Sequence, residues 1–181
     1  MTTVFKILIV GDIGVGKTTS IKRFTEDKLI RVEKTVGVDM VLKNIKVNVK
    51  KSKTIEITLQ IWDFSGGPQF RDILHNYADG THGVIFMFDS TNIKTLHGLR
   101  EWFRNVDSNL PQAVPKLLVS SKHDLRESNL NDDILQDHMN KFKYNDYYPI
   151  SSYTGENVDI VFQRICDLIV NRLSFYGSLK K

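Results

Sequence analysis

The residues from Gly11 to Thr18 have the sequence G-D-I-G-V-G-K-T and directly follow the apolar run Val4–Val10. They match the pattern G-x-x-x-x-G-K-S/T, in which a buried strand leads through a glycine-rich turn into a helix. Glycines admit backbone conformations that a Cβ forbids, so successive N–H groups of the loop can converge on phosphate oxygens. The helix that follows points its partially positive N-terminus at the same anion. The pattern therefore predicts a loop that binds a nucleoside di- or triphosphate.

Two side chains of this predicted loop add chemistry to the backbone. Lys17 supplies a mobile cation for the terminal phosphates, and Thr18 offers a hydroxyl to Mg²⁺. The simpler alternative, a glycine-rich turn that binds nothing, accounts for neither side chain. We therefore expect nucleotide-binding roles for Asp12, Ile13, Gly14, Val15, Gly16, Lys17, Thr18 and Thr19.

The length and composition of the chain are typical of one soluble globular domain. Its 181 residues can bury a full core, and 41% of them are hydrophobic. The single cysteine, Cys166, cannot form a disulfide within the chain, which favours a reducing, cytoplasmic compartment. No segment is long and apolar enough for a membrane span or a signal peptide. The formal net charge of +4 is mild and the five histidines are scattered, so we expect neither a nucleic-acid partner nor a histidine metal cluster.

Hydrophobic periodicity predicts the strands that follow the first loop. Residues 45–49 and 55–61 alternate apolar and polar side chains on either side of a turn at Lys51 and Ser52. This alternation predicts an antiparallel hairpin. Residues 83–88 and Lys116–Val119 are nearly continuous apolar runs, as expected for strands that are covered on both faces.

Between and after these strands, apolar residues recur at helical spacing over 96–106, 134–142 and 158–173. Alternating strands and helices predict an α/β fold. Together with the phosphate-binding loop at Gly11–Thr18, they indicate the P-loop NTPase type. We expect a doubly wound sheet, mostly parallel with one antiparallel hairpin strand, with helices on both faces. The expected domain covers residues 1–175, and a short C-terminal tail covers 176–181.

Three groups of polar residues follow predicted strands, where sheets of this kind bind their ligands. Asp63 ends the second hairpin strand and can hold Mg²⁺ through water, while the nearby Gly66 can offer its N–H to a γ-phosphate. Asp124 can accept two hydrogen bonds from the N1–H and 2-amino groups of guanine, a donor pair that adenine lacks. The methylene stem of Lys122 can lie along the base. The third group consists of Ser151, Ser152 and Tyr153.

With these residues, the chain resembles the Ras superfamily of small GTPases over nearly its whole length. It is most similar to the Rab branch, and it also resembles septation-type relatives of Rab. The Rab likeness rests on Thr35–Asp39, Trp62–Asp63 and Thr154–Val158, and the septation-type likeness on Ile85–Thr91 with Glu101–Trp102.

The resemblance implies roles at the phosphate end of the site. Lys17 and the loop amides would grip the phosphates, and Thr18 and Thr35 would bind Mg²⁺ beside Asp63. Thr35 and Gly66 would sense the γ-phosphate. Its loss would free both switch regions, an order–disorder change that partner proteins detect.

At the base end, the resemblance assigns guanine selection to Asp124 and gives the backbone N–H of Ser152 to the guanine oxygen. Ser121 stands where the family usually has asparagine, or threonine in Rho-type proteins. We expect guanine binding to survive, with a shorter reach from Ser121 to the phosphate loop. Leu29 stands where Rab proteins place an aromatic residue over the base, which predicts faster nucleotide release. Beyond the first loop, the predicted nucleotide-binding residues are Thr35, Gly66, Ser121, Lys122, Asp124, Ser151, Ser152 and Tyr153.

The candidate catalytic residues depart from the family pattern. Gly67 occupies the position of the family's water-positioning glutamine, so we expect slow intrinsic hydrolysis. Gln69 is the alternative, if Pro68 shifts the segment so that the amide of Gln69 reaches the water. Thr35 completes the candidate catalytic set. Ile13 replaces the small residue that faces the arginine finger of a GTPase-activating protein (GAP).

We therefore expect a guanine-nucleotide-dependent switch with slow GTP hydrolysis, Mg²⁺ as cofactor and GTP or GDP as ligand. Effectors, an exchange factor and a GAP would act through the two switch regions, and we expect a monomer. One alternative is a GTP-binding scaffold that hardly hydrolyses, which Gly67 and Ile13 favour. Another is a P-loop nucleotide kinase, which would need an arginine-rich lid that the sequence does not offer. The sequence ends without a cysteine for prenylation, so either it is truncated or partners recruit the protein to membranes.

Overall fold

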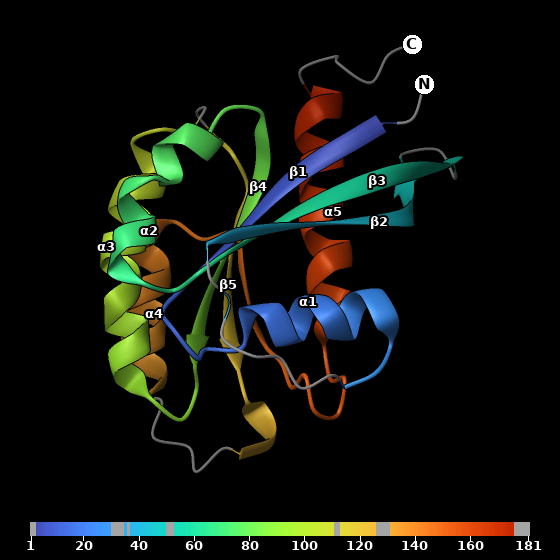
Figure 1. Ribbon diagram of the computed structural model, residues 1–181. Helices are drawn as coiled ribbons and strands as arrows, with labels where there is room; N and C mark the ends of the chain where they lie inside the picture. Colours follow the sequence, from blue (N-terminus) through green and yellow to red (C-terminus); the bar gives the residue numbers. More distant parts are fainter. Residues whose placement is uncertain are drawn as a thin grey trace.

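The computed structural model describes residues 3–29, 35, 37–49, 53–110, 113–125 and 131–175. Its described part is built on a six-stranded sheet with the strand order β2-β3-β1-β4-β5-β6 (Figure 1). The strands are β1 (Thr3–Val10), β2 (Val38–Val49), β3 (Lys53–Phe64), β4 (Thr81–Asp89), β5 (Lys116–Ser121) and β6 (Asp146–Pro149). The α-helices are α1 (Lys17–Glu26), α2 (Pro68–Asp72), α3 (Ile93–Asp107), α4 (Asp132–Phe142) and α5 (Val158–Phe175). Two short 3-10 helices are η1 (Leu74–Tyr77) and η2 (His123–Leu125).

The strand directions confirm the predicted mixed sheet. Strands β2 and β3 pair antiparallel, with Ile45 opposite Ile57, whereas the pairs β1–β3, β1–β4, β4–β5 and β5–β6 are parallel. Both hairpin strands are longer than the alternating segments predicted from the sequence, since they extend to Val38 and Phe64. The predicted turn at Lys51 and Ser52 lies outside the described residues.

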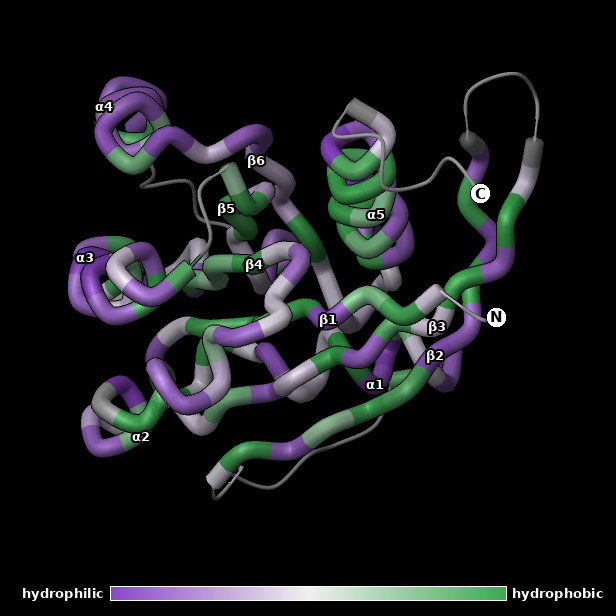
Figure 2. Tube along the Cα trace, turned by 90° about the horizontal axis from the view of Figure 1, so that it is seen from above, coloured by the Kyte–Doolittle hydropathy of each residue, from purple (hydrophilic) through white to green (hydrophobic). Residues whose placement is uncertain are grey.

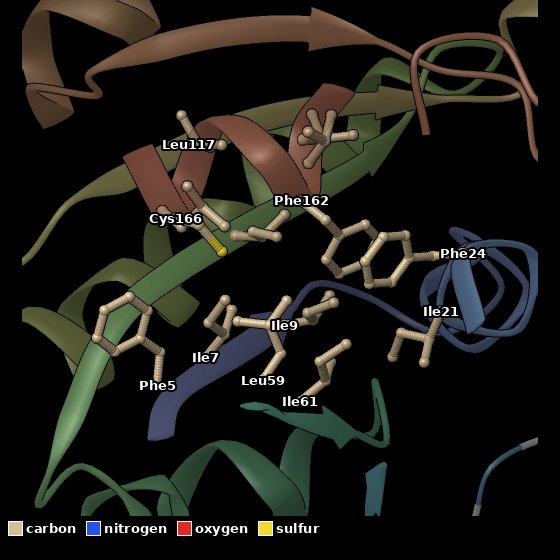
Figure 3. Packing of buried hydrophobic residues seen from close by; sticks show 14 of the residues in the cluster. Phe5, Ile7, Ile9, Ile21, Phe24, Leu59, Ile61, Leu117, Phe162 and Cys166 are labelled. Carbon is tan, nitrogen blue, oxygen red and sulfur yellow. The ribbon is translucent and has the colours of Figure 1, made fainter. Parts of the chain in front are cut away.

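Helices cover both faces of the sheet, as predicted. Figure 2 shows α5 on one side and α2, α3 and α4 on the other. Helix α1 lies on the side of α5, because Phe24 belongs to the same core as Phe162. Because successive side chains of a strand point to opposite faces, Ile7 and Ile9 of β1 enter the core under α1 and α5, while Leu8 enters the core under α3. In the first core, the rings of Phe24 and Phe162 stack with centroids 4.0 Å apart (Figure 3).

Cys166 is buried in that first core (Figure 3). Burial raises the pKa of its thiol, because the charged thiolate loses its hydration there. The thiol is therefore a packing group.

The parallel pairing brings several strand ends to one edge of the sheet. Asp63 of β3 lies beside Ile9 of β1, and Asp89 of β4 lies beside Ser121 of β5. Polar residues that are far apart in the sequence thus end their strands at the same edge, which is where sheets of this kind bind ligands.

Helix α5 ends at Phe175, and the predicted tail, 176–181, lies outside the described residues. The division of the chain into a domain and a tail therefore stays a prediction. Among the helices that the structure describes, none has the length and apolar character needed to span a membrane.

A histidine is buried where α3 and α4 pack together. The ring of His138 lies 4.5 Å from the ring of Phe142 and stacks on Tyr144 at 5.7 Å. Neither ring nitrogen is in hydrogen-bonding geometry with another described residue. Burial, followed by electrostatic repulsion from Arg100 and His97, lowers the pKa of His138 to about 4, although the Leu96 backbone and Asp137 oppose the shift.

This buried ring predicts a loss of stability in acid. In the unfolded chain a histidine has a pKa of about 6.5. As the pH falls below that value, the unfolded state therefore binds a proton that the folded state does not yet bind. Between pH 7 and pH 5 we expect His138 alone to lower the free energy of unfolding by about 2 kcal/mol. Urea unfolding of the parent and of His138→Phe at both pH values measures this difference. An equal loss of stability in parent and variant would contradict the prediction.

Candidate functional site

The phosphate loop connects β1 to α1 with the geometry predicted for it. Gly16 precedes α1 with a φ of 92°, in the left-handed region that favours glycine. The Nζ of Lys17 donates hydrogen bonds to the backbone oxygens of Gly11, at 2.8 Å, and Asp12, at 2.9 Å. Lys17 is only 6% exposed, and this burial lowers its pKa to about 8, while Asp63 and Asp12 favour the charged form. The loop thus holds a desolvated cation at neutral pH.

The three residues predicted to bind a metal ion lie together beside this cation. The Oγ1 of Thr18 is 2.6 Å from the Oγ1 of Thr35 and donates a hydrogen bond to the Oδ2 of Asp63. The other carboxylate oxygen, Oδ1, is buried and has no hydrogen-bond partner among the described residues. Burial raises the pKa of Asp63, opposed mainly by the hydrogen bond from Thr18 and by the charge of Lys17. Hydroxyl and carboxylate oxygens are donors that suit a hard cation such as Mg²⁺.

A cavity of about 370 Å³ opens over the phosphate loop. The segment after β3 closes one side of it by packing directly against the loop. A Cβ built on Gly66 would lie 2.2 Å from the backbone nitrogen of Ile13, so glycine is required there. The cavity is lined by Ile13, Gly14, Gly16, Lys17, Thr18, Thr19, Thr35, Phe64, Ser65 and Gly66.

A second cavity, of about 350 Å³, adjoins the first and shares Gly16 and Thr19 with it. Asp124 lines it, and one carboxylate oxygen accepts a hydrogen bond from the buried Oγ of Ser151 at 2.6 Å. That hydroxyl in turn accepts the backbone N–H of Thr154 at 3.1 Å, which fixes the loop after β6. The lining residues are Gly16, Thr19, Leu29, Ser121, Lys122, Asp124, Leu125, Ser152 and Tyr153.

The structure corrects one expectation about Ser121. We expected its short side chain to reach the phosphate loop less well than asparagine would. Instead, its buried Oγ is 2.5 Å from the backbone oxygen of Val15 and 3.1 Å from that of Phe88. The reach suffices because the ends of β4 and β5 lie side by side next to the loop.

Asp89 belongs to the site but was missed by sequence reasoning. Its Oδ2 accepts a hydrogen bond from the Nζ of Lys122 at 2.6 Å, and its Oδ1 accepts hydrogen bonds from the backbone N–H and the hydroxyl of Thr91. These contacts hold the lysine that lines the second cavity. The signal was present in the sequence, since Asp89 ends an apolar strand just as Asp63 does. Leu125, in the wall of the second cavity, was also missed.

The side chain of Asp12 points away from both cavities. Its Oδ1 accepts hydrogen bonds from the Nη2 of Arg71, at 2.8 Å, and from the indole of Trp102, at 2.9 Å. Arg71 also pairs with Glu101. A Cβ on Gly98 would lie 2.2 Å from the other oxygen of Asp12, so α3 leaves room for the carboxylate. Asp12 thus joins the phosphate loop to α2 and α3.

The candidate catalytic residues do not come together. Thr35 lines the phosphate cavity, but Gly67 and Gln69 do not. The amide of Gln69 folds back over Gly67, with its oxygen 2.7 Å from where a Cβ of residue 67 would stand. Gln69 instead lines a separate groove between α2 and α3, together with Arg71.

The chain matches the family model described as "Ras family" over residues 6–171. It is 31% identical to "Ras-related protein Rab-10" of Caenorhabditis elegans, in an alignment that covers 93% of this chain and 82% of that protein. It is 32% identical to "Ras-related protein Rab-1" of Theileria parva, covering 96% and 78%. It is 34% identical to "Ras-related protein Rab-1A" of Dictyostelium discoideum, covering 94% and 82%.

These matches confirm the predicted Ras and Rab resemblance, whereas the likeness of Ile85–Thr91 to septation-type GTPases stays a prediction. The sheet order, the phosphate loop and the two adjoining cavities agree with them. This chain therefore belongs to the Ras family, as a Rab-like small GTPase.

Proposed function

We propose that this protein is a guanine-nucleotide-dependent switch that hydrolyses GTP slowly by itself. One observation carries the proposal: a cavity that contains Lys17 adjoins a cavity that contains Asp124, and the two share Gly16 and Thr19. Such a cleft, with a cation at one end and a carboxylate at the other, suits a nucleotide. Its phosphates would lie over the loop beside Lys17, and its base would lie in the second cavity beside Asp124.

In this proposal, Asp124 selects the base by accepting the N1–H and 2-amino groups of guanine. The hydrogen bond from Ser151 supports this role because it fixes the carboxylate in the cavity wall. Ser152 offers its backbone N–H to the guanine oxygen. Lys122, held by Asp89, lays its stem along the base.

Mg²⁺ is the proposed cofactor, with Thr18, Thr35 and Asp63 as the residues that hold it. The unpartnered buried oxygen of Asp63 supports this assignment, because a buried carboxylate oxygen without a donor is costly unless a ligand satisfies it. When bound, the ion neutralises charge on the β- and γ-phosphates. Lys17, which lines the same cavity, binds the phosphates, and Thr35 together with the backbone of Gly66 senses the γ-phosphate.

Slow hydrolysis follows from what lines the phosphate cavity. Among the described residues of its wall there is no carboxamide to orient a water molecule. Phosphoryl transfer asks a protein mainly for positioning and charge stabilisation, so the missing group affects the rate directly. The alternative function, a GTP-binding scaffold with little hydrolysis, gains support from Ile13, which is 48% exposed and lines the same cavity.

The proposed partners are effectors, an exchange factor and a GAP that contact the switch regions. The first includes Thr35 and Gly37, and the second runs from Asp63 through α2. We further propose a cytoplasmic monomer that partners recruit to membranes, with a role in vesicle trafficking or signalling. The similarity to Rab-1 and Rab-10 supports this part of the proposal.

Asp124→Asn tests the base assignment. The substitution removes the carboxylate that pairs with guanine, so we expect the affinity for GDP to fall roughly 30- to 1000-fold, about 2–4 kcal/mol. Binding of xanthosine diphosphate should improve. Titration of both nucleotides against Asp124→Asn and against the control Asp132→Asn, at an exposed position at the start of α4, measures the change. Equal GDP affinity in Asp124→Asn and the parent would disprove the guanine assignment.

Gly67→Gln tests the cause of slow hydrolysis. The backbone at position 67 is extended, with φ −69° and ψ 145°, and the Gln69 amide that a new side chain would meet is flexible. We expect single-turnover GTP hydrolysis to accelerate about tenfold or more, roughly 1.4 kcal/mol in barrier.

In the same assay, Gln69→Ala should leave the rate of GTP hydrolysis unchanged. Asn105→Ala, which removes another carboxamide from the groove between α2 and α3, is the matched control. A collapse of the rate in Gln69→Ala alone would make Gln69 the water-positioning residue.

A further inference from the structure

Two carboxylates share the guanidinium of Arg71, one on its buried side and one on its exposed side. On the buried side, the Oδ1 of Asp12 accepts a hydrogen bond from Nη2 at 2.8 Å, and only 15% of the arginine side chain and 24% of the aspartate side chain are exposed. On the exposed side, Glu101 pairs with Nη1, but its own side chain is 61% exposed. Because water screens an exposed ion pair much more than a largely buried one, the contact with Asp12 is the stronger of the two.

The indole of Trp102 supports both partners of this buried contact. Its N–H donates a hydrogen bond to the Oδ1 of Asp12 at 2.9 Å, and the guanidinium of Arg71 lies 5.3 Å from the centre of the ring. Trp102 is fully buried on α3, within a close-packed core that holds its ring in place. The Asp12–Arg71 ion pair therefore lies against a fixed surface.

The ion pair also determines where the segment after β3 lies. Gly66 packs so closely on the phosphate loop that a Cβ there would collide with the backbone of Asp12 and Ile13. Arg71 follows in α2, a helix of five residues, which is too short to be stable without tertiary contacts. The ion pair ties this short helix to the loop at residue 12, next to the point where Gly66 packs.

The connection is made by protein groups that lie outside both cavities. Among the described residues that line the two cavities, neither Asp12 nor Arg71 nor Trp102 occurs. The segment that carries Gly66 can therefore be ordered before a γ-phosphate arrives. Conformational freedom that has already been lost does not weaken the binding of that phosphate.

We propose that the Asp12–Arg71 ion pair holds Gly66 against the phosphate loop whether or not a γ-phosphate is bound, and thereby raises the preference of the site for GTP over GDP. The inference rests on the proposed function, in which the backbone of Gly66 senses the γ-phosphate. It gives Asp12 a positioning role in place of the nucleotide contact expected from the sequence. It also limits the expected release of the second switch region, because α2 stays attached to the loop after the γ-phosphate is lost.

Calorimetric titration with GDP and with the slowly hydrolysed analogue GTPγS tests the proposal. In Asp12→Asn and in Arg71→Gln, we expect the affinity for GTPγS to fall about tenfold and the affinity for GDP to change less than about twofold, since only GTPγS uses Gly66. The double variant should lose no more than either single variant, because both substitutions break one contact. Each single variant is a test by itself, so the proposal stays testable if one of them fails to fold.

Each substitution has a matched control in the same groove. Glu101→Gln neutralises the exposed carboxylate that pairs with the same arginine, and Arg104→Gln removes another cation from the groove between α2 and α3. Both controls should keep the parent affinities. An equal loss of GDP and GTPγS affinity in Asp12→Asn would overturn the inference, because the carboxylate would then act on the whole nucleotide. Parent-like affinities in Asp12→Asn and Arg71→Gln would overturn it as well.

Hydrogen exchange gives a second readout, which a general loss of stability would not imitate. The backbone N–H of Phe70 donates to the oxygen of Gly67 at 3.0 Å and reports the first turn of α2. With GDP bound, we expect α2 to be protected in the parent and to exchange about tenfold faster in Asp12→Asn. GTPγS should restore most of this protection in the variant, because the γ-phosphate then orders the segment. An unprotected α2 in the GDP-bound parent would contradict the inference.

The proposed function fails separately from this inference. If the parent binds ADP as tightly as GDP, the guanine assignment is wrong, and the comparison of GTPγS with GDP still decides the role of the ion pair. If the parent prefers guanine nucleotides and Asp12→Asn keeps the parent affinities, the guanine assignment stands and the ion pair has no part in the choice of nucleotide.

Discussion

The buried opposite charges of Lys17 and Asp63 set the conditions for the rest of the site. Taking either charge out of water costs several kcal/mol, and here each is satisfied only in part. Lys17 relies on two backbone oxygens, and Asp63 relies on the hydroxyl of Thr18 while one oxygen has no partner among the described residues. Such an arrangement is far from optimal for stability alone. It suits the polyanionic nucleotide and the divalent cation that we propose for this site.

The end of the cleft where we propose that the base binds is organised by hydroxyl groups. Ser121 bonds to the backbone of the phosphate loop, and Ser151 bonds to Asp124. Each hydroxyl belongs to a buried residue, so each bond is protected from competition with water. Two short side chains therefore tie three loops from distant parts of the sequence into one wall, and position the carboxylate within it.

The sequence predicted the fold well because its signals are local. The alternating hairpin strands, the continuous buried strands and the helical spacing each follow from burial, and the observed sheet has these elements in the predicted layers. The sequence also indicated which residues after the strands lie at the two cavities, because parallel strands end at one edge of the sheet. The roles assigned to those residues stay predictions.

The side-chain contacts that could not be predicted from the sequence depend on strand register and on the direction of each side chain. The reach of Ser121 to Val15 depends on how β5 lies beside β4 and the phosphate loop, which no local pattern encodes. The outward turn of Asp12 depends on the space that Gly98 leaves on α3. The position of the Gln69 amide is a rotamer choice on a short helix. Asp89 is different, because the strand-end argument that found Asp63 would have found it too.

The contact between Asp12 and Trp102 gives the protein an optical property of its own. The indole N–H bonds to a carboxylate of the phosphate loop, and the guanidinium of Arg71 lies 5.3 Å from the centre of the ring. Indole emission shifts with the charges around the ring, and here one charge comes from the phosphate loop and the other from α2. The emission of Trp102, alongside that of the second tryptophan, Trp62, should therefore respond to changes in the contact between these two segments. Separation of Arg71 from Asp12 would remove both charges from their present places around this ring and is expected to shift its emission.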